Sequence, residues 1–269
     1  MDVTLLDYVP LWGVFFGTVL VVVLSVEVGF QIGGFRRRRS DAEKEAPVGS
    51  IVGATLGLLA FMLAFTFGLA ASRFDARRMV VLEESNAIGT SYLRAGLLPE
   101  LHREEIRRLF REYVDIRLVA VRSGSIERVN QMMSESSELH DALWSQTTEL
   151  AEKDPHSIVT GLFIQSLNEV IDLHAKRALL GLHNRVPEIV WWTLHFIMIF
   201  SMVALGYQEG LAGSRRSLAV LTLAITFSWV ILLIADLDRP HEGSIRVSQQ
   251  SMVDLQRSFA KPNPEQSKP

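Results

Sequence analysis

Three acidic residues that follow the last long apolar run of the chain are candidates for metal chemistry. Asp236, Asp238 and Glu242 lie close together in the sequence, and carboxylate oxygens are the ligands that hard cations such as Ca²⁺ prefer. Arg239 and His241 interrupt the group, however, and the same pattern is typical of an ion-pair cluster at a helix end. We favour the ion-pair cluster and predict no metal site, with these three carboxylates as the candidate ligands.

A single carboxylate, Glu27, lies inside the first apolar run, ahead of the basic cluster that begins at Arg36. An ionisable group is costly in hydrocarbon, so it usually faces protein or water. Two interpretations stay open. Glu27 either belongs to a pathway or gate, or its side chain extends to the membrane interface near Arg36.

Motifs of the common enzyme classes are missing from the sequence. It contains no Gly-x-Ser-x-Gly, no Walker or dinucleotide glycine loop and no His-Glu-x-x-His. It also has no Cys, which excludes disulfides, thiolate metal sites and cysteine nucleophiles. We therefore predict that the protein is not an enzyme, needs no cofactor and binds no nucleic acid.

The elements that position these residues are four long apolar runs. They are Pro10–Gly34, Gly49–Ala71, Ile189–Tyr207 and Ser217–Ala235. Each has roughly the 20 apolar residues that a helix needs to cross about 30 Å of hydrocarbon, and barrel strands are shorter and alternate in character. The sequence predicts an all-α, multi-pass protein of the cell (inner) membrane, with four spans arranged as two hairpins in the lipid bilayer.

Most of the remaining chain has the amphipathic period of helices, with breaks at Leu98-Pro99, Ser123-Gly124-Ser125 and Asp154-Pro155. No Gly or Pro follows Ser72 until Gly89, so we expect the second span to continue as one helix into this region. The predicted parts are a first hairpin at 1–71, a helical extramembrane domain at 72–187, a second hairpin at 188–236 and a C-terminal segment at 237–269. Its tail, Lys261–Pro269, is rich in Pro and charge and is expected to be disordered.

The second span has two differently composed sides. Gly49, Gly53 and Gly57 are four residues apart, which places them on one face and lets another helix approach closely. Larger residues follow helical spacing on the other side: Leu58, Phe61, Phe65 and Ser72. Such a stripe is also typical of side chains that simply face lipid or the protein core.

This span carries a family resemblance. Phe61-Met-Leu-Ala-Phe65 and Ser72-Arg73-Phe74 resemble the second transmembrane helix of the bestrophins, and the order of two spans, a helical block and two more spans is similar. A bacterial bestrophin-like family of unknown function is matched more closely. The matching segments are Leu59–Phe67, Ser72–Arg78, Glu84–Ala95, Asn168–Asp172 and Asp236–Pro240.

Bestrophins are pentameric ion channels whose second helices surround the pore, so the resemblance implies a homo-oligomeric ion channel, with five subunits as the expected number and small inorganic ions as its substrates. It implies a pore neck of Phe61, Phe65 and Leu58, with Gly49, Gly53 and Gly57 in helix packing. The pathway or gating candidates are Glu27, Ser72, Asp75, Glu83 and Asn86. The acidic calcium clasp of animal bestrophins is not matched in this sequence.

Three points stay open at this stage. The protein is alternatively a non-conducting, membrane-anchored scaffold or signalling protein. The sign of a permeant ion is undetermined, because Asp75 and Glu83 are acidic whereas Arg73 and Arg77 are basic. The basic loops that close the two hairpins favour the cytoplasm by the positive-inside rule, whereas the resemblance implies that the helical domain lies there.

Overall fold

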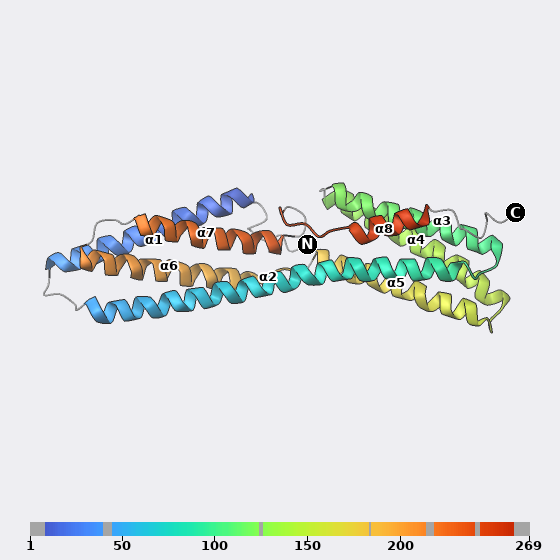
Figure 1. Cartoon of the computed structure of the whole chain (residues 1–269), viewed down its shortest axis with the longest axis horizontal. Helices are drawn as coiled ribbons and strands as arrows, with labels where there is room; N and C mark the ends of the chain where they lie inside the picture. The colour runs from blue at the N-terminus through green and yellow to red at the C-terminus, as the bar shows by residue number, and fades with distance from the viewer. Residues whose placement is uncertain are drawn as a thin grey trace. The chain divides into compact units, whose positions relative to one another are not determined.

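Every regular element of the described chain is a helix (Figure 1). The computed structural model describes residues 9–39, 45–123, 126–182, 184–213, 218–239 and 243–260, and no strand occurs in these ranges. The helices are α1 (Leu11–Arg39), α2 (Glu45–Ala95), α3 (Glu100–Ser123), α4 (Ile126–Lys153), α5 (Ile158–Leu182), α6 (Glu188–Ala212), α7 (Leu218–Asp238) and α8 (Gln250–Phe259). The expected all-α fold is confirmed.

Four of these helices, α1, α2, α6 and α7, are long and apolar enough to cross a membrane by length and composition. The longest, α2, has 51 residues and is therefore about 75 Å long at 1.5 Å per residue. That length exceeds the roughly 30 Å of a bilayer's hydrocarbon core more than twofold. The expectation of one helix that continues beyond its apolar segment is confirmed, because no helix breaker interrupts α2 between Ser72 and Gly89.

The chain divides into two compact units, and α2 contributes to both. The first unit comprises the described residues of Met1–Phe74 and His183–Ile245, and the second those of Asp75–Leu182 and Arg246–Pro269. In the first unit α1, α6, α7 and the N-terminal part of α2 lie side by side (Figure 1). In the second unit the rest of α2 packs with α3, α4, α5 and α8.

Glycines bring α1 and α6 into backbone contact in the first unit. A Cβ built on Gly29 would overlap the carbonyl oxygen of Val203, and one built on Gly206 would overlap the carbonyl oxygen of Val26. Gly33 and Gly210, each one turn further on, are equally crowded by the facing backbone. Small residues let helices approach closely where lipid provides no hydrophobic drive for association, so these two glycine pairs set the closest packing of the unit.

The second unit has its own apolar core, to which all five of its helices contribute. The central side chains include Phe110 and Tyr113 of α3, Leu143 of α4 and Phe163 of α5, each fully buried. The short helix α8 is amphipathic and buries Met252 against this core. Because Ile106, Phe110 and Tyr113 recur every three or four residues, α3 presents one continuous apolar face to its neighbours.

Candidate functional site

The predicted neck residues lie on a face of α2 that has no neighbour in the described chain. Phe61 is 64% exposed, Phe65 51% and Leu58 49%. The two phenylalanine rings stack on each other, with centroids 6.4 Å apart and planes at 19°. The opposite side of the helix, with Leu59 and Leu63, is buried against the rest of the first unit.

The predicted packing glycines Gly53 and Gly57 lie on this same exposed side of α2, and the expectation of two differently composed sides is wrong, because Gly57 is only about 40° around the helix from Phe61. A Cβ built on Gly53 or Gly57 would meet nothing within 4 Å, and one on Gly49 would lie 3.1 Å from Nε2 of Gln208. Gly68, further along the exposed face, is equally open. A packing role for Gly53 and Gly57 therefore needs a helix from another chain and stays a prediction.

The pathway candidates of α2 continue along its exposed side. Ser72, Asp75 and Asn86 are exposed, and Asp75 makes no hydrogen bond or ion pair through its side chain with any residue that the structure describes. Glu83 is half-exposed and forms an ion pair with Lys176 of α5, at 2.8 Å between Oε2 and Nζ. Outside α2, Glu27 is partly buried and accepts a hydrogen bond from Gln31 at 2.8 Å.

The carboxylates considered as metal ligands bind backbone groups instead. Asp236 Oδ1 accepts hydrogen bonds from the backbone N–H of Ser244 at 2.7 Å and of Ile245 at 3.4 Å. Asp238 Oδ1 accepts one from the backbone N–H of Val186 at 2.8 Å. Glu242 lies outside the described residues, and no group of three or more His, Cys, Asp or Glu that could hold a metal occurs among those described. Asp236 and Asp238 thus fix the segments around α7.

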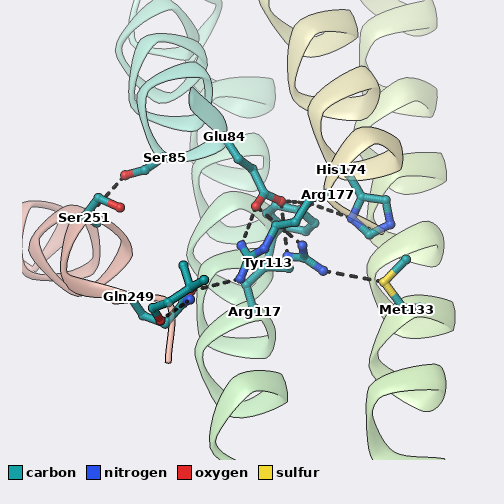
Figure 2. Close-up of polar contacts among 10 residues, drawn as sticks. Glu84, Ser85, Tyr113, Arg117, Met133, His174, Arg177, Gln249 and Ser251 are labelled. Atoms are coloured by element: carbon teal, nitrogen blue, oxygen red, sulfur yellow. Dashed lines mark hydrogen bonds and ion pairs between the residues drawn. The ribbon is translucent and has the colours of Figure 1, made fainter. Parts of the chain in front are cut away.

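A second constellation, buried in the second unit, centres on Glu84 of α2 (Figure 2). Its carboxylate lies 3.1 Å from Nε of Arg117 and also forms an ion pair with Arg177 of α5. The Tyr113 hydroxyl donates to Oε1 of Glu84 at 2.8 Å. With 0% of Glu84 exposed, α2, α3 and α5 share one buried polar contact.

The hydrogen bonds of Tyr113 determine the protonation of His174. The hydroxyl has a single hydrogen, which it donates to the Glu84 carboxylate, since a carboxylate can only accept. His174 Nδ1 lies 3.0 Å from the same hydroxyl oxygen and must therefore donate to it. The neutral His174 ring accordingly carries its proton on Nδ1. Its neighbour His140 packs at 4.8 Å between ring centroids, and its buried Nε2 has no hydrogen-bond partner among the described residues.

The environment shifts the pKa values of these groups in directions that keep one carboxylate charged and both histidines neutral. Burial opposes ionisation of Glu84, but the guanidinium groups of Arg117 and Arg177 outweigh it and lower the pKa to about 2. Burial and the Arg117 charge lower the pKa of His140 to about 4 and of His174 to about 3. At neutral pH the cluster thus contains one carboxylate and two guanidinium groups.

The cluster also connects to helix α8. Arg177 Nη2 donates to Oε1 of Gln249 at 2.9 Å, and Ser85 Oγ donates to the carbonyl oxygen of Ser251 at 3.0 Å (Figure 2). Further along α2, the Tyr92 ring stacks on Phe259 with centroids 3.9 Å apart. Because the side chains at the centre of the cluster are buried, we interpret it as an anchor that fixes α2 within the second unit.

Sequence reasoning missed this cluster. Glu84 was noted only as part of a family motif, and Arg117 was not singled out. A signal was nevertheless present, because Arg117 continues the apolar stripe of α3 one turn after Tyr113. A charge on an otherwise apolar face indicates a buried partner of opposite sign.

Apolar helices long enough to span a bilayer are typical of a membrane protein, and the similarity of this chain to known proteins agrees. Residues 10–252 match the bestrophin-like domain, so the chain belongs to the bestrophin-like family. The fold is similar to crystal structures of two variants of a bacterial bestrophin homologue from Klebsiella pneumoniae. One is 16% identical, covers 91% of this chain and 97% of its own, and has a TM-score of 0.65. The other is 15% identical, covers 90% of this chain and 96% of its own chain, and has a TM-score of 0.64. No curated protein matches the sequence.

Proposed function

We propose that this protein is a homo-oligomeric ion channel, with five subunits as the expected number, in which the exposed face of α2 lines the ion path. Membership of the bestrophin-like family supports an ion-channel function. The four candidate spanning helices of the described residues are too few to enclose an aqueous path alone, so several copies are needed. The spans form two hairpins, and residues 72–187 form the extramembrane domain.

The observation that carries the proposal is the composition of the exposed face of α2. Phe61 and Phe65 lie among small residues with open space around them, including Gly57 and Gly68. The exposed face of α1 carries Gly17 among large apolar side chains such as Trp12 and Phe16, whereas that of α2 carries three open glycines, Gly53, Gly57 and Gly68. Glycines favour contact with protein over contact with lipid, so α2 faces other subunits and the path they surround.

The chemistry of the neck follows from its side chains. Phe61 and Phe65 from several subunits would form two stacked apolar rings. Such a constriction controls ion flow by dewetting, without selecting charge. Closing the path therefore requires no titratable or covalent step, only a small change in the radius of the two rings.

The proposal is tested by mass measurement in mild detergent and by ion flux in liposomes. We expect a symmetric oligomer, and we expect Phe61→Ala with Phe65→Ala to raise the flux because the neck widens and wets. A matched control is available on α6, where Phe196 and Phe200 are 62% and 57% exposed and pack ring against ring at 4.5 Å. Their replacement by Ala should leave the flux unchanged.

A monodisperse monomer contradicts the proposal. So does an intact oligomer that conducts no ions, either as wild type or as the Phe61→Ala, Phe65→Ala variant. Either result favours the scaffold or signalling alternative, in which the spans only anchor the helical domain.

A further inference from the structure

The charged residues of α2 differ in their angular position around the helix axis relative to Phe61. Because α2 is one continuous helix, each residue turns it by about 100°. Asp75 therefore lies about 40° around the helix from Phe61, whereas Arg73 lies about 120° away. Arg77 lies about 160° away and Arg78 about 100°. Of these four residues, only Asp75 lies on the same face as Phe61.

The contacts of these side chains agree with their positions. Arg73 donates to the carbonyl oxygen of Arg185, which directs it away from the exposed face. Arg77 is buried, with 5% of its surface exposed. Arg78 is exposed at the side of the helix. None of these three arginines therefore shares a face with Phe61.

The acidic residues after Phe61 on α2 also differ in their burial and in their ion-pair partners. Glu84 is fully buried between two guanidinium groups. Glu83 lies about 40° from Phe61, but Lys176 neutralises it. Asp75 is exposed, and its carboxylate is paired with no described residue. The face that leaves the apolar segment thus carries one uncompensated negative charge per chain.

From this we infer that the ion path is selective for cations over anions and that Asp75 is the residue that sets this preference. The inference rests on the proposed function, since it requires copies of α2 around one path. Asp75 follows Ser72 at the end of the apolar segment, so the carboxylates would form an acidic ring beyond the neck. Rings of Asp or Glu raise the local concentration of cations and repel anions. The phenylalanine rings would control whether ions pass, and the carboxylate ring would determine whether cations or anions are preferred.

The test is the permeability ratio of K⁺ to Cl⁻, measured from reversal potentials in bilayers that hold the full-length protein under a KCl gradient. The wild-type ratio should be well above one. Asp75→Asn should lower it several-fold towards one, and Asp75→Lys should bring it below one. Asp141→Asn is the control, because Asp141 is exposed on α4; it should leave the ratio unchanged.

Asp75→Cys separates charge from structure within one sample, since the chain has no other Cys. Alkylation with iodoacetate restores a carboxylate and should restore the ratio, whereas neutral iodoacetamide should not. A wild-type channel that conducts but prefers Cl⁻ or neither ion, or a ratio unchanged by Asp75→Asn, overturns the inference and leaves the proposed function intact. Absence of any wild-type current overturns the proposed function itself.

Discussion

Glu84 of α2 and Arg117 of α3 form a buried ion pair, with Oε1 of the carboxylate 3.1 Å from Nε of the guanidinium. Buried ion pairs contribute little net stability compared with apolar residues of similar shape, but the loss of one partner is severe because the other charge stays buried and uncompensated. Here two guanidinium groups, of Arg117 and Arg177, depend on the single carboxylate. The pair therefore fixes how α2 is held within the second unit.

We expect Glu84→Gln to destabilise the second unit by roughly 3–5 kcal/mol, since it leaves Arg117 and Arg177 buried without a counter-charge. Amide hydrogen exchange of α3 and α5 peptides in detergent measures the effect locally. Glu105→Gln is the control, because its ion pair with Arg108 is exposed and its loss should have little effect on stability. Equal exchange in the two variants would mean that Glu84 anchors nothing.

The two buried histidines predict a loss of stability in acid. The pKa of His140 is lowered from 6.5 to about 4 in the folded protein, so below pH 6.5 the unfolded chain binds the proton more readily and folding weakens. His140→Phe removes this contribution. The stability of the variant relative to wild type should rise as the pH falls from 6.5 to about 4 and then level off, as followed by thermal unfolding. A difference that does not depend on pH would show that His140 is not held neutral.

Glu84 predicts a further loss at lower pH. Its pKa is lowered from 4.5 to about 2, so its contribution is complete above pH 4.5 and is lost as the pH falls towards 2. Wild-type protein should therefore continue to lose stability below pH 4.5, and Glu84→Gln should flatten this part of the curve. Parallel curves for the two proteins below pH 4.5 would contradict the assignment of the lowered pKa to Glu84.

The glycine contact between α1 and α6 predicts opposite effects of one substitution at two positions. Gly206→Ala should destabilise the first unit by about 1–3 kcal/mol, because its Cβ would overlap the backbone at Val26. Gly17→Ala, also in a spanning helix, would meet nothing within 4 Å and should stabilise by up to about 1 kcal/mol through helix propensity. Thermal unfolding in detergent distinguishes them. A neutral Gly206→Ala would mean that α1 and α6 do not pack through their backbones.

The sequence predicts the elements of this fold better than their contacts. The apolar runs and the absence of breakers after Ser72 are local properties, and they were enough to predict four spanning helices and the continuous α2. Contacts between helices depend also on which surface of another helix packs against them, and this is not a local property. Gly53 and Gly57 have the same spacing as Gly29 and Gly33, yet among the described residues only the second pair meets another backbone.

The choice of Glu84 as the buried carboxylate was beyond sequence reasoning for a related reason. Glu83 and Glu84 are neighbours of identical chemistry, and only the rotation of α2 about its axis decides which one is buried. Glu83 is half-exposed against Lys176, whereas Glu84 is fully enclosed. The sign of the charge on the α2 face stayed open for the same reason, since Asp75 and Arg77 are two positions apart but lie on different sides of the helix.

The measurement that tests the central claim most directly is a cysteine scan of α2, for which the Cys-free chain is already suited. Single Cys variants on the exposed face, at Phe61, Gly68 and Ser72, are compared with variants at the buried positions Leu59, Leu63 and Ala70. A charged, membrane-impermeant thiol reagent is added while ion flux in liposomes is recorded. If α2 lines the path, flux is blocked at the exposed-face positions and unaffected at the buried ones, with the period of the helix. Flux that the reagent leaves unchanged at all six positions, or changes without that period, would contradict the account.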